Sequence, residues 1–333
     1  MSISHVHASP PSSGETSRGE GAAARRRGGR SVGRRSDPAR SPYGRSASIR
    51  GWLYVAPALV LALVFLFYPL LFNIGNSLNT GEGIGTGNFV RLFADPIFGT
   101  AFVNSLLWVV VTTGVEMVLG FLLAYLIHSF LNRIGGVLRT ILFLPMAVTP
   151  TVSAIVFTNI YAPQYGLLYG LFNDFGLGGA MPSILGTPHL SSFGIMVVNI
   201  WQWLGFFVLM YAVGIAAIDP EIMGAADVDG AVGWNRMRLI VLPLLKSTHW
   251  SLVILGAIQA LQQFPLIYLM TGGGPANSSQ VLATYIFQKG FTEGDMTYAS
   301  AISVVLLVLA LIIAAVQLIV SRGDFSIGGR ARS

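Results

Sequence analysis

Six long apolar runs, separated by shorter polar segments, set the pattern of the chain. They cover Leu53 to Ile74, Val103 to Phe130, Leu138 to Tyr161, Phe193 to Ile218, Ser247 to Met270 and Tyr298 to Val320. A helix needs about 20 apolar residues to cross a bilayer, and lipid offers no hydrogen-bond partner to an irregular backbone. The pattern therefore predicts an all-α membrane protein with six transmembrane helices in one polytopic domain, residues 52–321.

Lysine and arginine are unevenly divided between the two sets of connections. Eighteen of the 20 lie in the tail to Gly51, after the second and fourth runs, and after the sixth run, which leaves Arg91 and Lys289 for the other side. Basic residues accumulate in cytoplasmic connections. Both termini and the segment 219–245 are therefore expected in the cytoplasm.

Composition supports a membrane class and excludes some chemistry. Only 10% of residues are charged, against about a quarter in soluble domains, and the absence of cysteine excludes disulfides and thiolate metal sites. Residues 1–51 are rich in Arg, Gly, Ser and Pro and predict a disordered tail. Such a tail could bind nucleic acid or anionic lipid, but we favour a topological role with no nucleic-acid partner. Residues 322–333 form a second cytoplasmic tail.

The connection after the fourth run, DPEIMGAADVDGAVGWNRMRLIVLPLL, is polar and rich in glycine. Asp219 followed by Pro220 is typical of a helix start, because aspartate accepts the free amide protons of the first turn and proline suits the first helical position. Gly230 and Gly233 predict a bend, followed by a second short helix that ends near Pro243. We call residues 219–245 the cassette and expect it to lie along the membrane surface.

The cassette resembles the EAA loop of ABC-transporter permeases, whose pattern is Glu-Ala-Ala, three residues, Gly, nine residues, Ile, one residue and Leu-Pro. The matching positions are Ala225, Ala226, Gly230, Ile240, Leu242 and Pro243, and Gly224 stands where the family has Glu. The stretches APALVLALVFLFYPL, LRTILFLP, NIWQWLGFFVLM and LIYLMTGGGPANSS resemble the carbohydrate-uptake branch of binding-protein-dependent permeases, of the MalF or UgpA type in its six-span form.

The resemblance implies a type I ABC importer permease fold in a bacterial inner (plasma) membrane. It also implies that the cassette, including Asp229, is a coupling helix that docks on separate ATPase subunits. The expected partners are a second six-span permease, two ATPase subunits, an extracytoplasmic solute-binding protein and the lipid bilayer. ATP and Mg would bind to the ATPase partner, and this chain would hold no cofactor.

Amides and aromatic rings inside the spans are candidates for a translocation pathway. Gln259, Gln262 and Gln263 have the spacing of one helix face, and the fourth run supplies Gln202 and Phe206 beside two tryptophans. Amides at membrane depth favour the bundle interior. They either contact a sugar or join helices by hydrogen bonds, and the sequence leaves both interpretations open.

Two titratable residues lie in the second run. Glu116 is costly at membrane depth, and we expect it to be protonated or paired with a hydroxyl such as that of Thr112, since a proton relay would need further intramembrane acids. His128 lies near the cytoplasmic end and is interpreted as interfacial, because no second ligand accompanies it at metal-binding spacing. No metal site is expected.

The loop after the fifth run contains Gly272, Gly273, Gly274 and Pro275. Glycines allow turns that other residues resist. The loop is an ordinary tight turn or, as the resemblance implies, a docking loop for the binding protein on the outer side.

No GxxxxGK[ST] loop or catalytic motif occurs in the sequence, so we expect a transport subunit and not an enzyme. The main prediction is a permease subunit for a sugar or oligosaccharide. The alternatives are an ABC permease for another solute, such as glycerol 3-phosphate or an amino acid, and a stand-alone channel or ion-driven carrier. The latter would require internal symmetry or an intramembrane charge network.

Overall fold

The computed structural model describes residues 46–81, 83–177 and 182–328, and the tail to residue 45 lies outside them. By their internal contacts the described residues divide into two units, one up to Leu59 and one from Val60 onward. The first described helix, α1 (Ser46–Ala62), begins inside the segment expected to be a disordered tail. The expected boundary at residue 51 thus falls within α1, and the domain boundaries stay predictions.

The regular elements of the described residues are helices. On the side before the cassette they are η1 (Leu63–Phe67), α2 (Tyr68–Ser77), α3 (Gly87–Ala94), α4 (Pro96–Phe130), η2 (Asn132–Ile134), α5 (Gly135–Phe143), η3 (Leu144–Ala147), α6 (Pro150–Ile160), α7 (Leu167–Asp174) and α8 (Leu190–Ala216). The cassette and the remaining chain form α9 (Pro220–Val228), α10 (Gly233–Arg236), η5 (Met237–Val241), α11 (Leu242–Leu244), α12 (Lys246–Leu261), α13 (Pro265–Met270), α14 (Leu282–Phe287), η6 (Gln288–Thr292) and α15 (Met296–Gly328).

Five helical segments of the described chain are long and apolar enough to cross a membrane, and a sixth results if a bent pair is taken as one span. The five are Tyr54–Ser77, Pro96–Phe130, Leu190–Ala216, Lys246–Met270 and Met296–Ile319. They coincide, apart from their ends, with five of the six expected runs. The six-helix membrane fold is thus confirmed, with one span broken.

The break falls in the third expected span, which bends by 95° between Gly135–Ala147 and Pro150–Ile160. Pro150 forces the preceding residue out of the helical region, and Thr149 adopts ψ 146° and caps α6 with its side chain, which accepts from the Val152 amide. The expected span from Leu138 to Tyr161 is therefore broken into two helical parts, because Pro145 and Pro150 lie within it.

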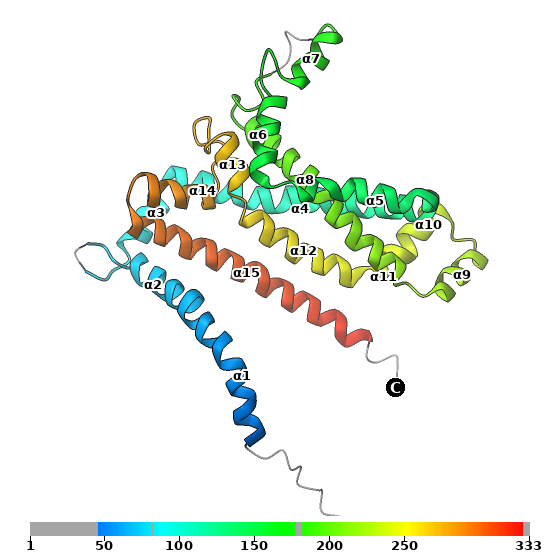
Figure 1. The fold of residues 1–333 in the computed structure, drawn as a ribbon, viewed down its shortest axis with the longest axis horizontal. Helices are drawn as coiled ribbons and strands as arrows, with labels where there is room; N and C mark the ends of the chain where they lie inside the picture. Colours follow the sequence, from blue (N-terminus) through cyan, green and yellow to red (C-terminus); the bar gives the residue numbers. More distant parts are fainter. Residues whose placement is uncertain (1–45, 82, 178–181, 329–333) are drawn as a thin grey trace, which may run out of the picture. The chain divides into compact units, whose positions relative to one another are not determined.

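The centre of the larger unit is built by α4, α8 and α12, which pack against one another (Figure 1). Small residues allow these helices to approach closely, as is common in membranes. A Cβ at Gly120 would lie 2.7 Å from the Phe207 Cβ, and one at Gly205 would lie 2.0 Å from the Leu142 carbonyl oxygen on α5. The backbones therefore meet where side chains would otherwise separate them.

The carboxylate of Asp95 links the start of α4 to α14 and α15 through hydrogen bonds. The Asp95 side chain caps α4 by accepting from the Ile97 amide at 2.9 Å, and its Oδ2 also accepts from the hydroxyls of Tyr285 and Tyr298. Burial alone would raise the pKa of Asp95, but these hydrogen bonds outweigh it and hold the pKa below its usual value of 3.8. The ionised form is therefore the one that the fold stabilises.

We expect Asp95→Asn to lower the thermal unfolding midpoint at neutral pH by a few degrees, since charge-assisted hydrogen bonds contribute more than neutral ones. A depressed folded-state pKa contributes stability above pH 3.8 that is lost as pH falls through the lowered value. The wild-type chain should therefore lose stability on acidification below about pH 4, and the variant should lose less. Scanning calorimetry from pH 3 to 7 checks this, with exposed Asp174→Asn as the control. Identical pH profiles for wild type and Asp95→Asn would contradict it.

Candidate functional site

A buried polar cluster joins the three central helices at Asn199. The Asn199 Nδ2 donates to Glu116 Oε1 at 3.0 Å, and the Asn199 Oδ1 accepts from Gln259 Nε2 at 2.7 Å and from Gln263 Nε2. Glu116 and Asn199 are fully buried and Gln263 is 6% exposed. Because polar groups at membrane depth are costly unless paired, Asn199 holds α4, α8 and α12 in one arrangement.

Glu116 accepts from the Asn199 amide and not from the hydroxyl of Thr112, which was the expected partner. The Thr112 hydroxyl donates instead to the Trp108 carbonyl of its own helix, at 2.7 Å. Asn199 was missed in the sequence, although a single amide within an apolar run is a signal of a paired interior position. Among the described residues, Glu116 Oε2 and Gln259 Oε1 have no hydrogen-bond partner, so the cluster retains two acceptor positions.

The three glutamines do not lie on one helix face. Helix α12 ends at Leu261, because Pro265 cannot donate to the Leu261 carbonyl and its ring would clash there in a continuing helix. Gln263 therefore turns into the bundle, whereas Gln262 caps α12 and is exposed. The prediction that all three glutamines share one helix face is wrong for Gln262, whereas Gln259 and Gln263 both donate to Asn199. Contact of any of them with a sugar stays a prediction.

Gln202 contacts the break in the third span. Its Nε2 donates to the Val148 carbonyl at 2.6 Å, and its side chain is buried. The carbonyl lies between η3 and α6, where the helical hydrogen-bond ladder is interrupted, so Gln202 satisfies a group that lipid could not. Phe206, also expected in the pathway, is half-buried and packs edge-on against Phe207.

The cassette folds as two short helices around a glycine bend. Asp219 caps α9, its side chain accepting from the Glu221 amide at 2.9 Å, as the sequence predicts. Gly230 has φ +73° and Gly233 has φ +56°. Both values lie in the left-handed region that favours glycine, and they turn the chain from α9 into α10.

Three contacts that the sequence did not indicate fix this bend. Arg236 forms an ion pair with Asp227 and donates from Nε to the Ala231 carbonyl at 3.1 Å. The Tyr125 hydroxyl of α4 donates to the Gly233 carbonyl at 2.9 Å. The cassette is thus attached both to itself and to the long central helix.

The residues expected to meet an ATPase lie mostly on the surface of the cassette. Those that are exposed are Gly224, Ala225, Asp229, Gly230, Leu242 and Pro243, whereas Ile240 is partly buried and Ala226 is 4% exposed. A Cβ at Gly224 would meet nothing within 4 Å. The position where the family has Glu is therefore open and could accommodate a longer side chain.

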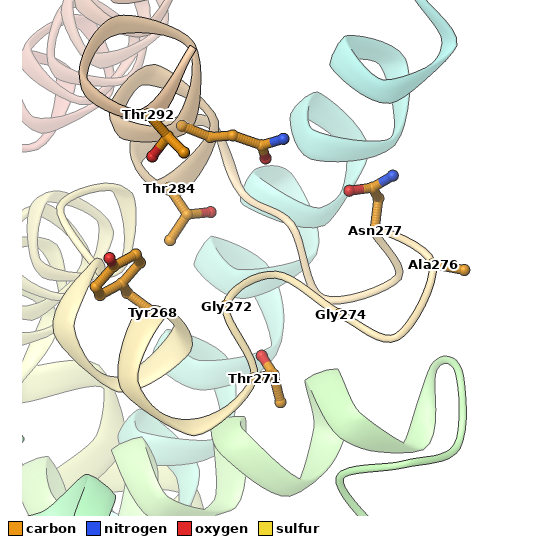
Figure 2. A pocket seen from close by; sticks show the side chains of 9 residues that line it. Tyr268, Thr271, Gly272, Gly274, Ala276, Asn277, Thr284 and Thr292 are labelled. Atoms are coloured by element: carbon orange, nitrogen blue, oxygen red, sulfur yellow. The ribbon is translucent and has the colours of Figure 1, made fainter.

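The glycine loop after α13 forms one wall of a hollow of about 460 Å³ (Figure 2). Figure 2 shows Tyr268, Thr284 and Thr292 on one side of it and Asn277 on the other. Its lining residues are Tyr268, Thr271, Gly272, Gly274, Ala276, Asn277, Thr284, Gln288 and Thr292. Hydroxyls, amides and one aromatic ring suit contact with a polar partner.

This loop is held firmly to α4. The Asn104 Nδ2 donates to the carbonyls of Ser278 and Gln280, both at 2.9 Å, and is buried with them. Gly272 and Gly273 have φ values of +61° and +90°, and a Cβ on Gly273 would overlap the Gln280 amide. The loop therefore has a defined geometry, and whether it receives a binding protein stays a prediction.

An apolar helical bundle that pairs amides and a carboxyl group within its spans is typical of a polytopic membrane protein with a polar interior. Residues 116–323 match the model of the binding-protein-dependent transport system inner membrane component. The chain belongs to this family, so it is a membrane-spanning permease subunit, as the resemblance implied.

Similar proteins and structures cover nearly the whole permease region. The chain is 31% identical to the lactose transport system permease protein LacF of Rhizobium radiobacter, over 85% of this chain and 97% of that protein. It is also 31% identical to the trehalose/maltose transport system permease protein MalF of Thermococcus litoralis, over 82% and 93%. A bacterial alginate ABC transporter, solved with an alginate pentasaccharide-bound periplasmic protein, contains a chain with a TM-score of 0.76 and 26% identity, over 85% of this chain and 98% of that one.

Proposed function

We propose that this permease imports a neutral sugar or oligosaccharide delivered by an extracytoplasmic binding protein. The observation that carries the proposal is the continuity of the cassette with α8 and α12, whose side chains meet at Asn199. A displacement of the cassette would therefore be transmitted directly to the amides within the membrane. The names of the relatives, which include lactose, trehalose and maltose, support a carbohydrate substrate.

In the proposed transport cycle, partner proteins supply the energy and the direction of transport. A second permease chain would complete the cavity, and two ATPase subunits would hold ATP and Mg and bind the exposed surface around Ala225 and Gly230 on the cytoplasmic side. Closure of the ATPase pair would move the cassette, tilt α8 and α12 and open the cavity outward, and hydrolysis would reset it. The loop from Gly272 to Pro275 would receive the binding protein at the opposite end.

Uncharged amides favour a neutral solute. Recognition of a phosphorylated substrate usually employs arginine or lysine, and the described cluster at Asn199 consists of amides and one carboxyl group. Sugars offer hydroxyls that pair with such amides. We therefore place glycerol 3-phosphate behind sugars as a substrate.

Co-purification tests the assembly. The tagged chain, extracted gently from its native membranes, should bring down an ATPase subunit, a second permease and, when sugar is present, a binding protein, all identifiable by mass spectrometry. Recovery of the chain alone or as a homo-oligomer, while ATPase subunits are detected in the same membranes, would overturn the proposal.

Gln262 and Gln263 should respond differently to alanine. Gln262 is exposed at the helix break and free of the Asn199 cluster, so Gln262→Ala should lower sugar uptake severalfold while the amount of assembled complex is unchanged. Gln263→Ala removes a buried interhelical hydrogen bond, worth about 0.6 kcal/mol on average in membranes, and should lower the thermal stability of the complex. Uptake assays beside thermal melts of both variants check this. Unchanged uptake in Gln262→Ala would remove Gln262 from the pathway.

A further inference from the structure

An apolar groove of about 490 Å³ lies between α4 and the second half of the cassette. One wall is formed by Met117, Val118 and Leu122 of α4, and Trp234 and Arg238 of the cassette line the other. Val118 is 58% exposed and Trp234 is 64% exposed. The groove therefore combines an apolar wall with one cationic group.

The wall of the groove on α4 lies near the level of the bilayer middle. The lining residues from Met117 to Leu122 lie between about 20 and 12 Å from the helix end at Phe130, at 1.5 Å per residue. Half of the hydrocarbon core is about 15 Å thick. An acyl chain lying along this wall would therefore begin near the cassette and end near the middle of the membrane.

The groups at the cassette end suit a lipid headgroup. Arg238 has no ion-pair partner among the described residues, whereas its neighbour Arg236 is occupied by Asp227 and the Ala231 carbonyl. Guanidinium groups bind phosphate through paired hydrogen bonds, and tryptophan favours the headgroup level. His249 also lines the groove, and its Nε2 has no partner among the described residues while its Nδ1 lies 3.0 Å from the Tyr211 hydroxyl oxygen.

We propose that the groove between α4 and the cassette binds one anionic phospholipid, with its phosphate on Arg238 and one acyl chain against Met117, Val118 and Leu122. The positive charge of Arg238 favours an anionic headgroup. The Nε2 atom of His249 would form a hydrogen bond with an ester or glycerol oxygen of the lipid. The lipid would bridge the cassette and the central helix, and its binding is independent of the solute that the permease carries.

The test uses the complex as purified with its accompanying subunits, placed in nanodiscs. Trace phosphatidylglycerol or phosphatidylcholine with a photoactivatable diazirine in one acyl chain is irradiated, and labelled peptides are mapped by mass spectrometry. The phosphatidylglycerol probe should label the segment 117–122 and the phosphatidylcholine probe should label it far less. Arg238→Gln should lower phosphatidylglycerol labelling about fivefold, as expected for one basic residue near a membrane surface, and Arg238→Lys should retain most of it.

The matched control is Arg133→Gln, an exposed arginine near the same end of α4, which should leave labelling unchanged. Val118→Trp, which fills the groove from a lipid-exposed position, should reduce labelling by the phosphatidylglycerol probe without loss of assembled complex. Equal labelling by both probes, or labelling insensitive to Arg238→Gln, would overturn the proposal. So would zero-length or short-range cross-links showing that a second protein chain covers the groove.

Discussion

Replacing Asn199 with leucine should reduce sugar uptake by at least about tenfold and destabilise the assembled permease. Leucine has the same number and branching of side-chain heavy atoms, although its methyl groups are bulkier, and it removes the donor to Glu116 and the acceptor for Gln259 and Gln263. Three interhelical hydrogen bonds at about 0.6 kcal/mol each give roughly 2 kcal/mol, and the carboxyl group of Glu116 is left buried without its partner. Uptake and thermal melting of the same preparation measure both consequences.

The matched control is Asn159→Leu. Asn159 is an exposed amide in α6, and its side chain bonds only to the Ile155 carbonyl of its own helix, so its loss should have little effect on either readout. Glu116→Gln keeps an oxygen that accepts from Asn199 and should retain most uptake if the carboxyl group is structural. Wild-type uptake in Asn199→Leu would show that the cluster neither joins the helices nor shapes the pathway.

Replacing Gly230 with leucine should uncouple the ATPase from the permease. Residues with a Cβ lose about 1 to 2 kcal/mol in the left-handed conformation, and Gly230 has φ +73°. Leucine would therefore shift the chain out of this conformation and displace α10 from α9, separating Asp227 from Arg236. A free-energy cost of about 1 to 2 kcal/mol corresponds to roughly a tenfold change. The amount of ATPase subunit that co-purifies with the tagged chain and the rate of ATP-driven uptake should therefore each fall by about that factor.

Two substitutions separate backbone conformation from side-chain bulk. Gly230→Asn should be milder, because asparagine tolerates the left-handed region. Gly224→Ala lies within helix α9, where a Cβ meets nothing within 4 Å, and should couple normally. If Gly224→Ala and Gly230→Leu lowered ATPase recovery equally, the bend would not be the feature that matters.

The spans and the cassette were predictable because their signals are local. Apolar runs mark the spans, and the Asp219–Pro220 start and the glycine bend mark the cassette. The bend in the third span has a local signal as well, since Pro145 and Pro150 lie within the run and proline breaks a helix. Pro265 acts in the same way on the glutamines, because it ends α12 before Gln262.

The remaining features depend on residues far apart in the chain. Asn199 meets Gln259 across 60 positions, and Asp95 meets Tyr298 across 203. No periodicity or spacing relates such residues, since helix packing alone brings them together. The orientation of the termini and the assignment of sugar-contacting residues likewise rest on charge distribution and resemblance, and both stay predictions.

We propose that this chain transports a solute inward only when an ATPase moves its cassette. The most direct measurement reconstitutes the complex in sealed proteoliposomes with ATP enclosed and follows uptake of a radiolabelled sugar in the presence of the co-purified binding protein. We expect uptake that requires both ATP and the binding protein and that falls about tenfold in Gly230→Leu. Uptake that proceeds without ATP, or that follows an imposed ion gradient, would contradict it and favour a channel or an ion-driven carrier.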